Sequence, residues 1–242
     1  IAYKEMRELE IEIIQQLVEL SKIAHQGKTH PEYEELNKTQ RDFAAKYKPT
    51  FWSNIQLTQF YGIEIDDFAH EVAILSLWLA EHQKNVKFKE VFGQGNPSLP
   101  LQEGGNIVCA NATRIPWEDV CPKDKEAEIY ILGNPPYLGG KFQEKTQKED
   151  MKYVLGKLKK YNNIDYIGCW FYLASKYVDE SVKVAFVSTN SVSQGTQVND
   201  LWPSIINETS NAEIFFAVKD FLWTNNAKNK AGVTCVIIGI RA

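Results

Sequence analysis

Short apolar runs rich in β-branched residues alternate with helical segments along this chain, and this alternation limits the fold more than any other feature. Such an alternation is typical of a mostly parallel sheet covered by helices. The last two runs follow each other without a helix between them, which predicts an antiparallel hairpin. The predicted strands cover residues 60–65, 106–110, 129–133, 183–188, 212–218 and 233–240. The sequence therefore predicts an α/β fold with a mostly parallel sheet and an antiparallel C-terminal hairpin.

The predicted helices differ in how much of their surface is apolar. Residues 1–21 carry apolar side chains at three- and four-residue spacing, and the polar segment 31–48 predicts a surface helix. Residues 68–82 are apolar on nearly all sides, which predicts a deeply buried helix. The stretch 89–105 is rich in glycine and proline and predicts a loop. A lysine-rich connection leads to further predicted helices over residues 164–179 and 201–206.

Composition limits the partners of the chain. With 242 residues, 44% of them hydrophobic, the chain can bury a substantial core. Its formal net charge of −4 excludes a globally basic nucleic-acid-binding protein, so a DNA contact requires a local patch. Residues 141–160 carry seven lysines against three acidic residues. This segment is either that patch or a solvated loop and helix face.

The spacing of the cysteines and histidines, together with the hydropathy, predicts a cytoplasmic protein without a metal site. The four cysteines are widely separated and form no C-x-x-C pair, which is typical of reduced thiols in a cytoplasmic protein. The four histidines show no metal-ligand spacing with carboxylates. Nothing reaches the length of a transmembrane span. We therefore expect a cytoplasmic protein without a metal site or a membrane anchor.

The predicted strand 129–133 ends in the tetrapeptide Asn134-Pro135-Pro136-Tyr137, whose groups suit the activation of an amino group. An exocyclic amine is a poor nucleophile because its lone pair is delocalised into the ring. The Asn134 side-chain oxygen and the Pro135 carbonyl can accept its two hydrogens, which directs the lone pair at an electrophile. Both prolines hold φ near −65° and offer no N–H, and Tyr137 offers a face for stacking. The competing interpretation is an ordinary Asn-Pro turn.

Two further polar residues end predicted strands and are candidates for binding a nucleoside. Glu64 can accept hydrogen bonds from two ribose hydroxyls; alternatively, Asp66 or Asp67 next to it only caps the following helix. The Asn111 side-chain amide can pair with the N1 and N6 edge of an adenine, or it can serve a turn. With their neighbours Ile65 and Ala112, these residues form the predicted cofactor-binding set.

In order along the chain, these segments resemble the γ-type amino-methyltransferases of DNA, which use S-adenosylmethionine to methylate adenine N6. The likeness is to the methylase part of bacterial polypeptides that fuse restriction and modification. It implies a Rossmann-like core in which Glu64 binds the cofactor ribose and Asn111 its adenine. It also implies that Asn134, Pro135 and Tyr137 hold a target base flipped out of double-stranded DNA. The segments that carry it are residues 62–66, 111–114, 133–137, 184–190 and 221–228.

The resemblance also assigns an aromatic residue near the start of the last hairpin to the other face of the target base. Trp223 is the first candidate and Phe221 the second. The alternative is that Trp223 only anchors the hairpin to the core.

One motif of the family is not found in this sequence. The glycine-rich loop that lies under the methionine part of the cofactor normally ends a strand just before the first helix. We therefore expect residues 1–242 to be a partial catalytic domain that lacks the first strand, that loop and a C-terminal DNA-recognition domain. Alone, it is expected to bind S-adenosylmethionine weakly or not at all and to transfer no methyl group. The strands on either side of the missing one would pair directly, recruit another copy or borrow other residues.

Two other functions use the same motifs. One is methylation of a protein glutamine or an RNA adenine, although the insertions at 31–48 and 89–105 favour the DNA enzyme. The other is a DNA-binding or assembly module that keeps the fold without catalysis. An intact glycine-rich loop upstream in the parent polypeptide would favour the enzyme, and its loss would favour the module. The resemblance also implies a fused nuclease and a target-recognition domain in that parent polypeptide.

Overall fold

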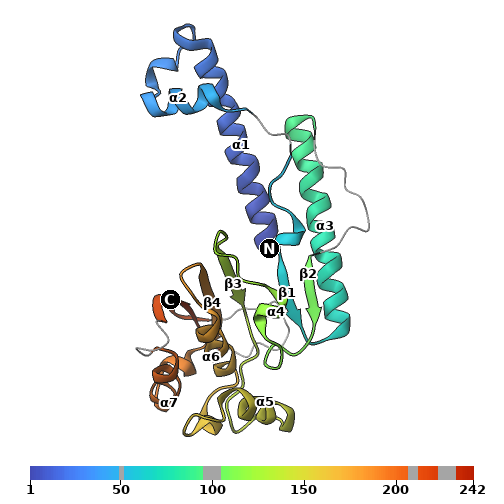
Figure 1. Ribbon diagram of the computed structural model, residues 1–242, viewed down its shortest axis with the longest axis vertical. Coiled ribbons are helices and arrows are strands. Elements are labelled where there is room, and N and C mark those ends of the chain that lie inside the picture. Colours follow the sequence, from blue (N-terminus) through green and yellow to red (C-terminus); the bar gives the residue numbers. More distant parts are fainter. Residues whose placement is uncertain (49–51, 95–104, 207–211, 223–232) are drawn as a thin grey trace. The chain divides into compact units, whose positions relative to one another are not determined.

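A computed structural model describes residues 1–48, 52–94, 105–206, 212–222 and 233–242 of the chain (Figure 1). The chain divides into two compact units, Ile1–Ala110 and Asn111–Ala242. Each unit has its own sheet, and each is described by itself below.

In its described residues, unit 1 combines three α-helices with a two-stranded parallel sheet. The strand β1 (Tyr61–Glu64) pairs with β2 (Asn106–Cys109), and α3 runs beside them (Figure 1). The Asp66 carboxylate caps α3 by accepting the Ala69 N–H at 2.8 Å, which confirms that an acid after Glu64 has this role. The helices are α1 (Ala2–Gln26), α2 (Lys38–Lys46) and α3 (Asp67–Phe92).

The packing of α1 against α3 is organised by a buried arginine. Arg7 donates to the Tyr3 hydroxyl at 2.7 Å and to Asn85 Oδ1 at 3.0 Å, and it pairs with Glu10 at 3.2 Å. A buried guanidinium needs such partners because its charge is costly to desolvate. Arg7 therefore joins the two helices through polar contacts, while Phe88 packs beside it.

The prediction that residues 68–82 are deeply buried is wrong. Phe68, Val72, Leu75 and Leu79 are exposed along one side of α3, with Phe68 78% exposed. The helix buries the opposite side, and a two-stranded sheet is too narrow to cover a second face of a 26-residue helix. The apolar side chains around α3 therefore include a face that no described residue of unit 1 covers.

Two other boundaries in unit 1 differ from the prediction. The helix α3 continues to Phe92, into the predicted loop 89–105, because residues 83–92 still place apolar side chains on one side of a helix and polar side chains on the other. Gly93 ends the helix with a φ of 73°. The predicted surface helix 31–48 begins only at Lys38, where Asn37 and Gln40 form a capping box.

Unit 2 contains a four-stranded sheet in the order β3-β4-β6-β5. The strand β3 (Ile129–Gly133) lies parallel to β4 (Val182–Thr189). The strand β6 (Thr234–Arg241) lies antiparallel to both β4 and β5 (Glu213–Leu222). The predicted C-terminal hairpin is confirmed, as is the α/β class, and the sheet of this unit is mixed.

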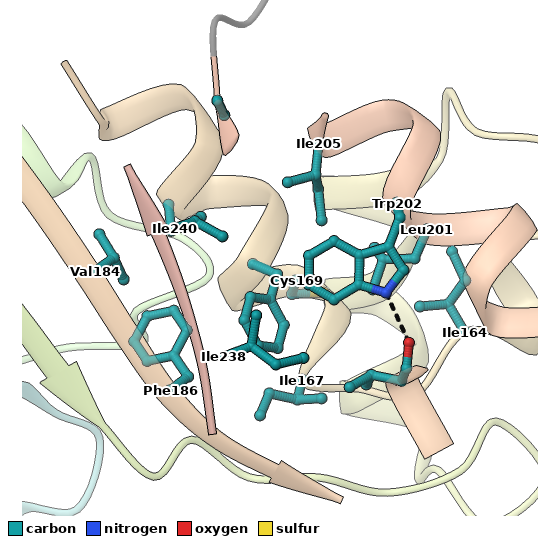
Figure 2. Packing of buried hydrophobic residues seen from close by; sticks show 14 of the residues in the cluster. Ile164, Ile167, Cys169, Val184, Phe186, Leu201, Trp202, Ile205, Ile238 and Ile240 are labelled. Atoms are coloured by element: carbon teal, nitrogen blue, oxygen red, sulfur yellow. Dashed lines mark hydrogen bonds between the residues drawn. The ribbon is translucent and has the colours of Figure 1, made fainter. Parts of the chain in front are cut away.

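The core of unit 2 lies between this sheet and its helices. Phe171 is fully buried, with ring centroids 5.5 Å from Phe186 and 5.2 Å from Trp202. The Trp202 indole N–H donates to the Val192 carbonyl at 2.7 Å, the dashed bond in Figure 2. The helices are α4 (Trp117–Val120), α5 (Lys145–Leu155), α6 (Gly168–Tyr177) and α7 (Thr196–Ile205). The lysine-rich connection thus contains a helix of its own, α5.

Candidate active site

The tetrapeptide leaves the sheet at the carboxyl end of β3. Its side chains alternate in exposure: Asn134 and Pro136 are exposed, Pro135 is buried and Tyr137 is half-buried. Gly133 pairs with Phe186 in the ladder, and a Cβ added to Gly133 would lie 3.3 Å from that ring. The close approach of β3 to β4 at this point favours glycine. The Asn134 side chain therefore projects outward from a tightly packed strand end.

Leu138, which follows the tetrapeptide, has both backbone polar groups bound. Its N–H donates to Asp165 Oδ1 at 2.8 Å. Its C=O accepts the Tyr166 backbone N–H and Gln143 Nε2, each at 3.0 Å. Asp165 and Gln143 are buried. The chain leaving the tetrapeptide is therefore fixed to the residues that precede α6.

The neighbouring strands bring Phe221, the second candidate for stacking on the target base, to the same edge of the sheet. Thr189 of β4 pairs with Cys235 of β6, which in turn pairs with Phe221 of β5. Burial raises the pKa of the Tyr137 phenol, and the adjacent Cys235 thiol raises it further, so the ring stays neutral. Tyr137 and Phe221 thus both neighbour Cys235. Trp223 lies outside the described residues.

In unit 1, Glu64 ends β1 with one carboxylate oxygen already bound. Its Oε1 accepts the backbone N–H groups of Ile65 at 2.9 Å and Asp66 at 3.2 Å. Within the described residues, Oε2 has no hydrogen-bond partner, and the side chain is half-exposed. The carboxylate is therefore held by its own strand end, with an oxygen left for a ligand hydroxyl.

In unit 2, the Asn111 amide serves the turn that the sequence offered as an alternative. Its Oδ1 accepts the Thr113 N–H at 2.9 Å and the Thr113 hydroxyl at 2.7 Å, and its Nδ2 donates to Asp150 at 3.1 Å. One N–H of the amide remains for a ligand. The Ala112 carbonyl accepts the Trp117 indole N–H at 2.9 Å. The Asn111 amide can thus donate one hydrogen bond to an adenine. It cannot form a pair of hydrogen bonds with the adenine edge without breaking its bonds to Thr113.

Asp150 is the buried carboxylate on which this turn depends. Besides Asn111, it accepts the Arg114 Nε–H at 2.6 Å and the Tyr166 hydroxyl at 2.7 Å. Burial acts to raise the pKa of the Asp150 carboxyl, but the three hydrogen bonds and the Arg114 charge outweigh it and lower the pKa. Asp150 is therefore ionised in the folded chain at neutral pH.

This shift predicts an acid-sensitive contribution to stability. The pKa of Asp150 is lower in the folded chain than its unfolded value of about 3.9, so the unfolded chain binds more protons and stability rises with pH. The contribution is complete above about pH 4 and is lost as the pH falls through the folded-state pKa. Between pH 5 and pH 3, the thermal midpoint of the wild type should fall more than that of Asp150→Asn. Parallel curves would contradict this role.

The lysine-rich segment 141–160 presents a basic face in unit 2. All seven of its lysines are exposed, and the ion pairs among the described residues of this unit involve Arg114, Lys123, Lys183 and Arg241 instead. At about 100° per residue, Lys145, Lys148 and Lys152 of α5 fall within an arc of about 60°. Gln143, which binds the Leu138 carbonyl, lies two residues before the first residue of α5. The basic face is therefore close in sequence to the tetrapeptide loop.

Sequence reasoning missed the buried polar residues that support the site: Asp165, Gln143 and Asp150. Asp165 stands three residues before α6, where an acid suggests a helix cap, and that signal pointed to a local role only. Asp150 lies in a charged helix and looked like a solvated side chain. Asp165 binds Leu138 and Asp150 binds Asn111 across long stretches of sequence, and Gln143 binds Ile164 as well as the nearby Leu138, so no local pattern identified these contacts.

Among the described residues, no group of three or more histidine, cysteine, aspartate or glutamate side chains is arranged to hold a metal ion. No helix in the described ranges combines the length and apolarity needed to cross a membrane.

Comparison with known proteins gives three concordant similarities. The family described as MmeI, DNA-methyltransferase domain matches residues 1–242. DNA methyltransferase A of Bacillus subtilis (strain 168) is 48% identical over 241 residues, which cover 99% of this chain and 24% of that protein. A solved structure of the Type IIL restriction-modification enzyme MmeI in complex with DNA has a TM-score of 0.77 and 36% identity, covering 99% of this chain and 29% of that one. The chain thus spans about a quarter of the length of these relatives.

Proposed function

The chain belongs to the MmeI DNA-methyltransferase domain family, and from this premise we propose that it transfers a methyl group from S-adenosylmethionine to N6 of adenine in double-stranded DNA. The observation that carries the proposal is the exposed Asn134 amide at the end of β3, beside the carbonyl of the buried Pro135. Two fixed acceptors at one strand end match the two hydrogens of an exocyclic amine.

The chain's own residues supply positioning and electrostatics to this reaction. Asn134 Oδ1 and the Pro135 carbonyl each accept one amine hydrogen, which draws the nitrogen lone pair out of conjugation with the ring. The prolines keep φ fixed, so these acceptors need little reorganisation as charge develops. The nitrogen loses its extra proton after transfer, so no strong general base is required. Most of the rate therefore comes from alignment of the amine with the methyl group.

The cofactor set fits S-adenosylmethionine in part. Glu64 would hold ribose hydroxyls through Oε2, since Oε1 is bound to backbone N–H groups, with Ile65 beside it. Asn111 would donate its remaining N–H to the adenine, with Ala112 beside it. When bound, the cofactor supplies an electrophilic methyl group on a sulfonium. The glycine-rich loop that would contact its methionine part is not among these residues.

We also propose that the chain works in restriction-modification in the cytoplasm, as the partial catalytic domain of a longer polypeptide with a target-recognition domain and a nuclease. Support comes from the matched solved structure, which is a restriction-modification enzyme in complex with DNA, and from the length of both relatives. Assays of activity therefore use the full-length protein that carries this chain.

The basic face of α5 is proposed to contact the DNA backbone. Each lysine that neutralises a phosphate adds about 0.9 to the slope of log affinity against log salt concentration. In the full-length protein, the triple change Lys145→Ala, Lys148→Ala and Lys152→Ala should lower this slope by about 2–3. The matched control is the triple change of the exposed lysines Lys28, Lys38 and Lys46, which should leave the slope unchanged. Equal slopes for the two triple variants would show that α5 is only a solvated face.

Base flipping gives a test of the stacking residues. A duplex with 2-aminopurine at the target position should brighten on binding the full-length protein, because the extruded base leaves its stack. Loss of a stacking ring costs about 1–3 kcal/mol per base, so Tyr137→Ala should weaken this complex about 5- to 150-fold. Tyr137→Phe keeps the ring and should behave like the wild type.

The same titration separates the two candidates for the second face of the base. Loss of signal with Phe221→Ala but not Trp223→Ala would assign the second face to Phe221, and the reverse result to Trp223. Equal behaviour of Tyr137→Ala and the wild type would remove Tyr137 from the base site.

The proposed function is tested by following labelled methyl groups from S-adenosylmethionine. The full-length protein is offered unmethylated duplex DNA, an RNA containing adenine, or a protein release factor with its acceptor glutamine. The proposal predicts label in DNA alone. Label in RNA or protein would support the other amino-methyltransferase activities, and no label in any substrate would support a non-catalytic module.

A further inference from the structure

Asp165 is a buried carboxylate, 3% exposed, that ties the loop after the tetrapeptide to the end of β4. Its Oδ1 accepts the Leu138 N–H at 2.8 Å and the Ile167 N–H at 3.4 Å. Its Oδ2 lies 3.2 Å from the Ser191 hydroxyl and 3.4 Å from the Thr189 hydroxyl; these hydroxyls bond each other at 2.5 Å, so one of them donates to Oδ2. Oδ1 therefore binds the loop after the tetrapeptide, and Oδ2 binds the hydroxyls at the end of β4.

The same residue is held from its backbone. The Asp165 N–H donates to Gln197 Oε1 of α7 at 2.9 Å. The next residue, Tyr166, donates its backbone N–H to the Leu138 carbonyl at 3.0 Å and its hydroxyl to Asp150 at 2.7 Å. The Asp165-Tyr166 pair thus connects the tetrapeptide loop with β4, with α7 and with the Asn111 turn.

These contacts leave Asn134 and Pro135 between two fixed points. Upstream, Gly133 is paired with Phe186 in the sheet. Downstream, Leu138 is bound at its N–H by Asp165 and at its C=O by Tyr166 and Gln143. Two prolines restrict φ between these points. The direction of the Asn134 amide and of the Pro135 carbonyl is set by how firmly the two ends are held.

We propose that Asp165 is a positioning residue for amine methylation: through the Leu138 N–H it holds the Asn134 oxygen and the Pro135 carbonyl in the geometry that the transition state requires. This inference rests on the proposed function. Asp165 acts through the loop and does not touch the base. A displacement of about 1 Å at a reacting centre can reduce a rate about a hundredfold, which is why a buried anchor matters to turnover.

The chemistry of the site explains why a carboxylate suits it. Two backbone N–H groups and a pair of hydroxyls face Asp165, and because the Thr189 and Ser191 hydroxyls also bond each other at 2.5 Å, one of the two remains to donate to the carboxylate. A carboxylate offers an acceptor oxygen to each side of this arrangement, whereas an amide offers only one. Bonds to an ionised acceptor are also about twice as strong as bonds to a neutral one. Asparagine keeps one oxygen for Leu138, and its NH₂ group can still donate to a hydroxyl oxygen. Asp165→Asn should therefore retain part of the function that Asp165→Ala loses.

The test compares turnover with binding in the full-length protein. Asp165→Ala should lower kcat about a hundredfold and Asp165→Asn about tenfold, with the cofactor Kd and the KM for DNA within about twofold of wild type. Tyr166→Phe, one residue away, removes only the hydroxyl bond to Asp150 and should instead raise the cofactor Kd through Asn111. Asp179→Asn is the control: Asp179 anchors Ser181 at the opposite end of β4 and should leave both quantities unchanged.

A second measurement does not depend on activity. Exchange of the Leu138 amide hydrogen, followed by NMR or mass spectrometry, should be faster in Asp165→Asn than in the wild type and unchanged in Asp179→Asn. Wild-type kcat and wild-type exchange in Asp165→Asn would overturn the inference. Equal losses of kcat and cofactor affinity would also overturn it, because they indicate general destabilisation. Failure of the wild type to methylate DNA would overturn the proposed function instead, and Leu138 exchange would still decide whether Asp165 fixes the loop.

Discussion

Replacing Asn134 by alanine in the full-length protein is expected to lower kcat by about 10²–10³, because removing one preorganised hydrogen-bonding group at a reacting centre costs about that factor. The cofactor Kd should change by less than about twofold, since the Asn134 bond to the amine strengthens only as the nitrogen becomes pyramidal. The exposed Asn134 side chain makes no hydrogen bond within the described residues that its loss would disrupt. Tritium transfer from labelled cofactor to duplex DNA measures the effect.

The matched control is Asn199→Ala, which removes the same side chain from an exposed position of α7. It should retain wild-type kcat and wild-type cofactor affinity. Near-normal turnover in Asn134→Ala would refute the role of Asn134. A joint loss of turnover and cofactor affinity would instead place Asn134 in the cofactor site.

The largest expected loss of stability comes from Phe171. Its ring is fully buried between Phe186 and Trp202, and truncation to alanine leaves a cavity that costs about 3–5 kcal/mol. Domains of this size are stable by only about 5–15 kcal/mol, so this single change removes a large share of the stability of unit 2. Urea unfolding of the chain followed by circular dichroism should show a midpoint shifted to much lower urea.

The control for Phe171 is the same substitution at Phe142, whose ring is 76% exposed. Phe142→Ala should change the free energy of unfolding by less than about 0.5 kcal/mol. Equal shifts in the two variants would show that the core of unit 2 is not centred on Phe171.

Patterns of short range predicted most of the fold. The strands, including Ile129–Gly133 with its observed bounds, follow from runs of β-branched residues between polar and glycine-rich segments. The hairpin β5-β6 was predicted because the sequence between its two strands carries no helical pattern. The helix α5 was missed because its many charged side chains hide the apolar positions Met151, Val154 and Leu155, which pack against the core. The exposed side of α3 was misjudged because apolarity does not say which element covers it.

The candidate site was predictable only where a residue acts through its own neighbours in sequence. The position of Asn134 at a strand end and the capping role of Asp66 follow from local order. For Asn111, the sequence left a turn and a ligand role open, and its contacts with Thr113 are those of the turn. Asp165 binds Leu138 across 27 residues, and its partners depend on the folded sheet. Long-range anchors of this kind require the structure.

We propose above all that Asn134 Oδ1 and the Pro135 carbonyl oxygen direct a methyl group to the exocyclic amine of adenine. The most direct measurement is the nucleoside composition of DNA after reaction with the full-length protein and S-adenosylmethionine, with Asn134→Ala in parallel. N6-methyl-2′-deoxyadenosine is expected as the product of the wild type, with almost none from the variant. Methyl groups on cytosine, or equal amounts of N6-methyl-2′-deoxyadenosine from both proteins, would show that these acceptors do not direct the transfer.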